Sequence, residues 1–300
     1  MKTEHYLVAG NRFALTMADD CPLVGLLRNY APFRTDKDGE PLFTLELIDS
    51  MDPVEKVPVY TEKAEEEDQP RIEIYRNGNP GDPRGFAWVF EMAPVQRMNI
   101  CARMIVSEDF SRAQLAVASV EAVGEFSVNN ALMLLYTFRT ASLKTLELHA
   151  SVILHEGKGY LFLGKSGTGK STHSQLWLNY IPDCELLNDD NPIVRVGEDG
   201  VIRVYGSPWS GKTPCYRNLE APVGAIVRLN QYPENRIRRC SAFEAYASVY
   251  PSCSGLRAIP TIGDGMHESI EKVALEIPCY VLDCLPDEGA ARLCHDTIVR

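Results

Sequence analysis

The feature that most constrains the fold is the stretch GKSGTGKST at residues 164–172. Its first glycine is followed, after four residues, by Gly-Lys-Ser at 169–171, which is the spacing GxxxxGK[ST]. The apolar run YLFL precedes the stretch and the helical pattern KSTHSQLWLNY follows it. This setting predicts a phosphate-binding loop between a strand and a helix of an α/β core.

The residue types in this loop suit a polyphosphate bound with a metal ion. Glycines let backbone amides converge on phosphate oxygens, and the start of the helix adds positive potential. We expect Lys170 to neutralise the β- and γ-phosphates and the Ser171 hydroxyl to ligate Mg²⁺. The predicted nucleotide-binding residues are Gly164, Lys165, Ser166, Gly167, Thr168, Gly169, Lys170, Ser171 and Thr172.

A pair of carboxylates follows the loop. The segment CELLNDDNP reads as an apolar strand that ends in Asp189 and Asp190. Such an end lies at the carboxyl edge of a sheet, where α/β proteins bind ligands. One carboxylate would hold the metal while the other takes a proton from an attacking hydroxyl.

Composition limits the partners. The net charge of −11 argues against nucleic acid or an anionic membrane as a partner, and hydrophobic content of 45% is that of an ordinary globular chain. Nine cysteines without a CxxC pair, and a start that lacks a signal-peptide pattern, predict reduced thiols in a cytoplasmic protein. No run of residues is apolar enough to span a membrane.

Two regions are expected. Residues 1–125 have strand periodicity, as in LFTLELID and RIEIYRNG, and predict a β-rich region with an antiparallel meander. A charged run at 62–70 predicts a solvated loop. Residues 126–300 begin with a helix that Ser127 would cap. In this region, expected strands such as LELHASVIL, GYLFLG and VGAIVRL alternate with helices. Further helices are expected near 266–275 and 288–299. This alternation predicts an α/β nucleotide-binding core with a mixed sheet.

The segment HASVILHEGKGYLFLGKSGTGKSTH, with LLNDDNPIV after it, resembles the catalytic domain of HPr kinase/phosphorylase and its relatives. That group shares its core with ATP-dependent phosphoenolpyruvate carboxykinase, and the resemblance covers roughly residues 146–239. It implies catalytic roles for Asp189 as acid/base, for His149 near the phosphates and for Lys170. It also implies that Asp190 joins Ser171 on Mg²⁺, and that the chain forms a homo-oligomer.

Basic residues further along the chain are weaker candidates for the phosphoryl group. Lys212 and Arg217 lie in the Gly- and Pro-rich segment GSPWSGKTPCYRN, which reads equally well as a turn over a packed Trp209. Arg228 lies in the basic segment VRLNQYPENRIRR, and the resemblance implies that a basic residue of this segment contacts phosphate, as residues after the corresponding strand do in the carboxykinases. A solvated or ion-paired arginine is the simpler interpretation.

These features predict an ATP- and Mg²⁺-dependent kinase that transfers the γ-phosphate to a hydroxyl of a protein serine or of a small molecule. The chain has neither the NKxD motif of GTPases nor an LSGGQ-like signature, which favours adenine nucleotide. Two alternatives remain open: a phosphoenolpyruvate carboxykinase-like enzyme, and a regulatory module that binds ATP without turnover.

Overall fold

The fold is that of a computed structural model that describes residues 1–61, 70–211 and 213–299. The charged run at 62–70, except Pro70, and the candidate Lys212 lie outside the described residues. The chain divides into two compact units, Met1–Arg139 and Thr140–Arg300. Within the described residues, no helix is both long and apolar enough to cross a membrane.

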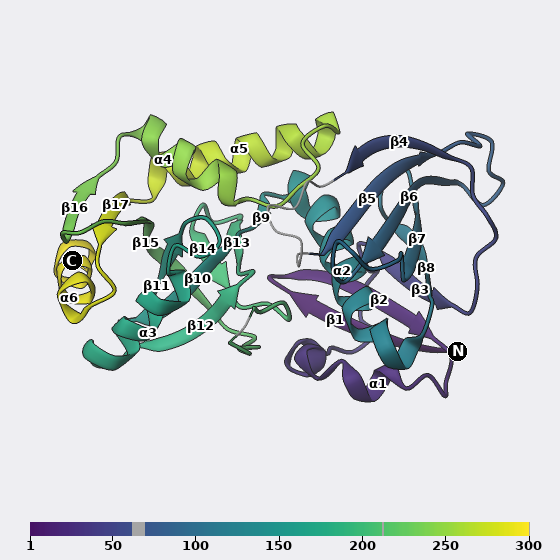
Figure 1. The fold of residues 1–300 in the computed structure, drawn as a ribbon, viewed down its shortest axis with the longest axis horizontal. Coiled ribbons are helices and arrows are strands. Elements are labelled where there is room, and N and C mark those ends of the chain that lie inside the picture. The colour runs from purple at the N-terminus through teal and green to yellow at the C-terminus, as the bar shows by residue number, and fades with distance from the viewer. Residues whose placement is uncertain (62–69, 212, 300) are drawn as a thin grey trace. The chain divides into compact units, whose positions relative to one another are not determined.

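The first unit is built on a mixed sheet of eight strands in the order β1-β2-β3-β8-β7-β6-β5-β4 (Figure 1). Strand β3 pairs in parallel with β2 and β8, and the other neighbours are antiparallel. The predicted meander is the run from β4 to β8. The strands are β1 Lys2–Val8, β2 Asn11–Met17, β3 Thr44–Ile48, β4 Lys56–Thr61, β5 Arg71–Asn77, β6 Phe86–Ala93, β7 Ala102–Ser107 and β8 Arg112–Val117.

Helix α2, Val120–Thr140, packs on this sheet. The Tyr136 hydroxyl donates to the carbonyl of Val8, and the ring of Phe138 lies 6.0 Å from that of Phe90. The predicted helix start at Ser127 is wrong, because its hydroxyl lies inside the helix and donates to the Val123 carbonyl at 2.6 Å. The hydroxyl that accepts an amide hydrogen bond at the helix start belongs to Ser119. The helix therefore belongs with the first unit, whose limit at Arg139 differs from the expected one at 125.

Two short helical segments, α1 Leu23–Leu26 and η1 Arg28–Phe33, complete the first unit. Its core contains a cluster of aromatic rings. Phe13 stacks on Phe43 at 5.0 Å and meets Tyr136 edge-on at 6.1 Å. These contacts join β2 to the segment before β3 and to α2, so the long helix and the sheet share one core.

The second unit is a mixed sheet of nine strands. Its main order is β12-β10-β11-β15-β14-β13-β9, and β17 pairs with both β15 and β16. The pairs β11–β15 and β15–β17 are parallel. The strands are β9 Thr145–Glu147, β10 Ala150–His155, β11 Lys158–Leu163, β12 Glu185–Asp190, β13 Ile193–Val196, β14 Ile202–Tyr205, β15 Glu220–Gln231, β16 Arg236–Arg239 and β17 Cys279–Cys284.

Helices cover this sheet on two sides, with α3 and α6 along one and α4 and α5 along the other (Figure 1). Trp177 of α3 packs into a hydrophobic core that also contains Phe162 of β11 and Leu282 of β17. The helical elements are η2 Ala141–Leu143, α3 Lys170–Tyr180, α4 Ala242–Val249, η3 Tyr250–Ser252, α5 Pro260–Glu276 and α6 Glu288–Ile298. The described chain is thus a mixed α/β protein with two mixed sheets.

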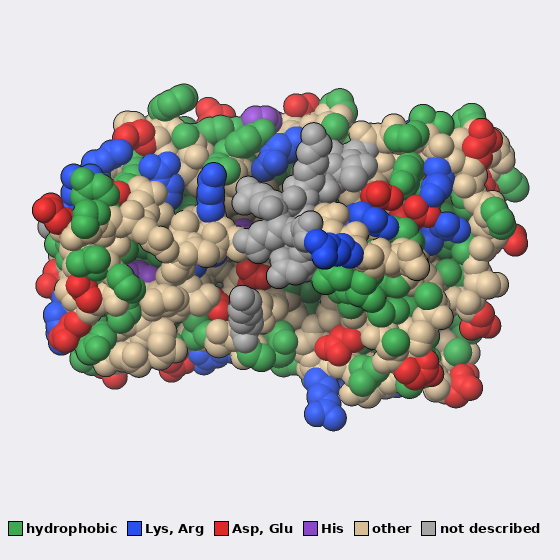
Figure 2. All heavy atoms as spheres, viewed as in Figure 1, with side chains coloured by type: hydrophobic (Ala, Val, Ile, Leu, Met, Phe, Trp, Pro, Cys, Tyr) green, Lys and Arg blue, Asp and Glu red, His purple; other side chains and the backbone are tan. Residues whose placement is uncertain are grey.

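Charged side chains of both signs lie on the surface of the molecule (Figure 2). On the face drawn in Figure 2, acidic and basic side chains are interspersed with apolar ones on both units. Several form exposed ion pairs, such as Arg76 with Glu108 at 2.8 Å and Arg236 with Asp283 at 2.8 Å. Exposed pairs of this kind contribute about 0–1 kcal/mol each.

Candidate active site

The glycine-rich stretch connects β11 to α3. Five of the six residues of β11 are buried, and only Lys158 is exposed. Because β11 ends at Leu163 and α3 begins at Lys170, the loop spans 164–169. A Cβ on Gly164 would lie 2.4 Å from Thr168 Oγ1, which explains a glycine there. Thr168 in turn donates to the Lys165 carbonyl at 2.8 Å. The loop therefore closes on itself in front of the free amides of α3, which attract anions.

Lys170 lies at the centre of the loop. Its ammonium donates to the carbonyl of Gly164 at 3.0 Å and to that of Lys165 at 3.5 Å. Burial lowers its pKa, while the charges of Asp190 and Asp189 act in the opposite direction. The side chain is therefore a nearly buried cation held inside the curve of the loop, where it would meet an incoming phosphate.

The two aspartates reach the loop from β12. This strand pairs with β10, so that Asp189 lies opposite Ser151 and Asp190 opposite Ala150. The hydroxyl of Ser171, in the first turn of α3, donates to Asp189 Oδ1 at 2.9 Å. The structure thus brings together a serine and a buried carboxylate, two hard oxygen donors of the kind that Mg²⁺ prefers.

Asp190 lies beside the predicted histidine. Its Oδ1 is 3.4 Å from His149 Nε2, and its backbone has a φ of 127°, unusual for a residue other than glycine. His149 precedes β10 and is fixed by its amide, which donates to the Ser252 carbonyl at 2.7 Å. Partial burial and then the charge of Lys170 lower the pKa of His149, against the effect of the two aspartates. Such a histidine is neutral at pH 7.

This pairing differs from the roles that the resemblance implied. The carboxylate next to Ser171 is that of Asp189, and the carboxylate next to His149 is that of Asp190. Asp189 is buried, whereas the side chain of Asp190 is 37% exposed. Of the two, Asp190 is therefore the one that an acceptor can approach.

The segment at 206–211 holds the aspartates in place. The amide of Gly211 donates to the Asp189 carbonyl at 2.7 Å, and the Ser210 hydroxyl donates to the same oxygen at 3.0 Å. A Cβ on Gly211 would lie 3.0 Å from the Cβ of Asp190, so a side chain there would press on the site. Trp209 is buried, as the turn interpretation expects.

Sequence reasoning missed the side chains that fasten this segment. The buried amide of Asn188 donates to the Trp209 carbonyl at 3.0 Å and to the Ser207 hydroxyl at 3.3 Å. Ser207 donates in turn to the Asn191 carbonyl at 2.6 Å. The only signal in the sequence is an asparagine that directly precedes the aspartate pair in an apolar strand; its partners are far away along the chain.

Two of the three basic candidates, Arg217 and Arg228, lie within the described residues. Arg217 forms an ion pair with Glu185 at 2.5 Å and donates to the Leu186 carbonyl at 2.9 Å, at the other end of β12. Arg228 lies in β15 opposite Leu163, the last residue before the loop. Its Nε is buried and, among the described residues, has no hydrogen-bond partner.

No arrangement of three or more His, Cys, Asp or Glu side chains within the described residues forms a metal site. The site instead offers the Ser171 hydroxyl with the carboxylates of Asp189 and Asp190. This small donor set fits Mg²⁺, which usually takes one or two carboxylates and completes its shell with water and substrate phosphates.

Comparisons with known proteins add little to this geometry. No protein-family model matches the chain, and no curated protein matches it. Among solved structures, the chain is similar to the Hpr(Ser) kinase/phosphatase from Coxiella burnetii. The match covers 51% of this chain and 88% of that one, with 13% sequence identity and a TM-score of 0.32. A likeness at this level supports no conclusion about chemistry, which must come from the site itself.

Proposed function

We propose that the chain is an ATP- and Mg²⁺-dependent phosphotransferase of the HPr-kinase-like class. It transfers the γ-phosphate to a hydroxyl of a protein serine or of a small molecule. The observation that carries this proposal is the hydrogen bond of 2.9 Å between the Ser171 hydroxyl and Asp189, at the foot of a glycine loop that surrounds the Lys170 ammonium. A phosphate cradle, a cation and a metal-binding pair are the parts that phosphoryl transfer requires.

The metal assignment follows from the donor set. Ser171 and Asp189 would hold Mg²⁺. When bound, Mg²⁺ neutralises charge on the phosphates. Removing the ion should therefore abolish transfer and leave the fold intact, because the protein groups at the site are already joined by their own hydrogen bonds.

The remaining groups have roles that follow from their positions. Lys170 stabilises negative charge on the transferring phosphoryl group. Asp190, partly exposed and next to His149, accepts the proton of the acceptor hydroxyl. His149, neutral at pH 7, orients this carboxylate. Asn188 and Ser207 keep the segment at 206–211 against both aspartates.

The test is incubation of the purified protein with γ-labelled ATP, Mg²⁺ and two sets of acceptors, serine-containing proteins or peptides and small hydroxylated molecules. Label on a hydroxyl supports the proposal, and EDTA should remove it. Turnover of oxaloacetate coupled to CO₂ release would instead make the chain a carboxykinase-like enzyme. ATP binding without any product would make it a regulatory module. Either of the last two results contradicts the proposal.

A further inference from the structure

Two histidines that are far apart in the sequence meet in the second unit. His155 is the last residue of β10, at the end of that strand away from Asp190, and His295 lies in the last turn of α6. Their Nε2 atoms are 3.3 Å apart, and their ring centroids are 5.2 Å apart. His155 is 6% exposed, whereas the side chain of His295 is 25% exposed. Solvent therefore reaches the pair from the side of His295.

The other nitrogen of each ring has a partner of its own. Nδ1 of His295 is 2.9 Å from Asp296 Oδ1. Because an ionised carboxylate only accepts hydrogen bonds, this Nδ1 carries the proton, and the Nε2 of the neutral ring has a free lone pair. Nδ1 of His155 is 3.6 Å from Cys184 Sγ, which can accept a hydrogen bond from it. His155 can therefore hold its proton on Nδ1 and direct a second lone pair from Nε2 toward His295.

Two nitrogen lone pairs that converge in this way match the coordination of one transition-metal ion. Zn²⁺ lies about 2.0–2.1 Å from each histidine nitrogen in a tetrahedral site, which places two such nitrogens about 3.3 Å apart. The observed distance between the two Nε2 atoms has this value. A carboxylate on the second ring nitrogen, as Asp296 provides, is the contact that orients zinc-binding histidines.

A further oxygen donor lies beside the pair. Glu156 Oε1 is 3.9 Å from the Nε2 of His155, and its side chain is 70% exposed. The neighbouring thiol of Cys184 is not a donor of this kind, because burial and then the charge of Asp183 raise its pKa to about 11 and keep it protonated at neutral pH. The pair is thus an open site with two histidine nitrogens, to which water or the Glu156 carboxylate can be added.

We infer that His155 and His295 bind Zn²⁺ or a similar divalent transition-metal ion, which fastens α6 to the end of β10. Imidazole nitrogen suits Zn²⁺, Ni²⁺ and Cu²⁺, whereas Mg²⁺ prefers oxygen. The site therefore differs in chemistry from the oxygen donors Ser171 and Asp189. With two histidine ligands it is smaller than a closed structural zinc site, which has four protein ligands. The inference does not depend on the proposed function.

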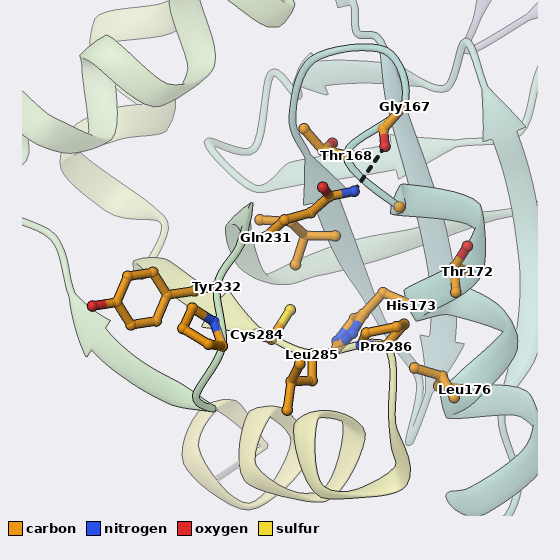
Figure 3. Close-up of a pocket in the computed structure, with 13 residues that line it drawn as sticks. Gly167, Thr168, Thr172, His173, Leu176, Gln231, Tyr232, Cys284, Leu285 and Pro286 are labelled. Carbon is orange, nitrogen blue, oxygen red and sulfur yellow. Dashed lines mark hydrogen bonds between the residues drawn. The ribbon is translucent and has the colours of Figure 1, made fainter.

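His173 of α3 shows how a buried histidine differs when its nitrogen is already used. Its ring faces the cavity beside the glycine loop, opposite Leu285 and Pro286 (Figure 3). Its Nε2 accepts a hydrogen bond from the Trp177 indole at 3.1 Å, and burial lowers its pKa to about 4. The lone pair of this Nε2 is therefore occupied, and the nitrogen is not offered to a metal ion.

The test is titration calorimetry of Zn²⁺ into the full chain, with Mg²⁺ in large excess to compete at the oxygen donors. His295→Gln removes one proposed ligand at a partly exposed position, where a change of side chain is tolerated. His155→Gln removes the other ligand, which is buried. The matched control is His267→Gln, which removes an exposed histidine of α5.

We expect one Zn²⁺ per chain to bind about tenfold or more weakly in His295→Gln and in His155→Gln, and with unchanged affinity in His267→Gln. Saturating Zn²⁺ should raise the Tm of the unmodified chain and of the control, but not that of His295→Gln, because the ion binds the folded chain. Equal Zn²⁺ affinity in the unmodified chain and in His295→Gln would overturn the inference. So would a dissociation constant of the unmodified chain above about 1 mM, since the two rings would then share only an N–H···N hydrogen bond.

Discussion

At the scale of single residues, the proposal depends most on Lys170. Its ammonium is buried and is held inside the loop by the carbonyls of Gly164 and Lys165. Lys170→Ala should lower phosphoryl transfer by at least about 100-fold. The control is Lys158→Ala, which removes an exposed lysine at the other end of β11 and should leave the rate unchanged. Equal rates for the two variants would contradict the assignment.

The two aspartates should respond differently to substitution. Because Asp189 contacts the Ser171 hydroxyl, Asp189→Asn should raise the Mg²⁺ concentration for half-maximal transfer by about tenfold or more. Asp190→Asn removes the proposed base and should lower kcat by about 100-fold or more with a nearly unchanged Mg²⁺ requirement. Titration of the rate with Mg²⁺ measures both effects. The opposite result would restore the roles that the resemblance implied, with Asp190 on the metal.

Individual residues also show where sequence reasoning ends. The placement of Gly164, Lys170 and Ser171 between one strand and one helix was predictable from local spacing, whereas their roles stay predictions. The contacts of Asn188 were not predictable, since Ser207 and Trp209 approach it through folding of distant segments. The ion pair of Arg217 with Glu185 joins residues far apart in the chain for the same reason.

At the scale of elements, the loop and its helix were the best predicted. The helical pattern KSTHSQLWLNY coincides with α3, because Trp177 and its neighbours face the core at helical spacing. The stretch LELHASVIL, expected as one strand, forms β9 and β10 instead. The break falls at His149, whose amide bonds to the Ser252 carbonyl, a partner that no local pattern reveals. This break between β9 and β10 places His149 beside Asp190.

In the first unit, strands β4, β6 and β7 are joined by a buried carboxylate. Glu91 accepts from Lys56 at 2.8 Å and from Arg103 at 2.7 Å. Burial raises the pKa of Glu91, but these two cations outweigh it, and the net pKa is lowered. The ionised carboxylate therefore stabilises the fold at neutral pH. This contribution is full above the unfolded pKa and is lost as the pH falls through the lower folded pKa.

Glu91→Gln should consequently reduce the free energy of unfolding at pH 7 by about 1–3 kcal/mol, with a smaller loss at pH 3. Urea unfolding at the two pH values measures this difference. The control is Glu108→Gln, because Glu108 pairs with Arg76 on the surface and should matter by less than about 1 kcal/mol. If Glu91→Gln reduced the free energy of unfolding equally at both pH values, the ionised form of Glu91 would not be the form that stabilises the fold.

At the scale of the whole molecule, the expected β-rich region and α/β core correspond to two mixed sheets, one in each unit. The sequence predicts the boundary between the two units near the start of α2, because Ser127 resembles an N-terminal cap. The observed boundary lies at the end of α2. Aromatic contacts of Tyr136 and Phe138 with the first sheet decide to which unit the helix belongs. Such contacts are tertiary, and helical periodicity alone does not reveal the partner.

The cysteines give a test of the entire fold. All nine are free thiols, and four of them, Cys101, Cys253, Cys279 and Cys294, are buried. Burial raises the pKa of each of these four, to about 12 for Cys279. A thiol reagent at pH 8 should leave these four unmodified in the native protein and react with all nine in denaturant. The Tm should not change with reductant. A fall in Tm on reduction would reveal a disulfide and contradict the fold.

The most direct measurement of the central claim is a crystal structure of the protein with a non-hydrolysable ATP analogue and Mn²⁺ in place of Mg²⁺. The account predicts phosphate oxygens against the amides of residues 167–171 and an anomalous Mn²⁺ peak at Ser171 and Asp189. A loop without phosphate in such crystals, or a metal peak away from Ser171 and both aspartates, would contradict it.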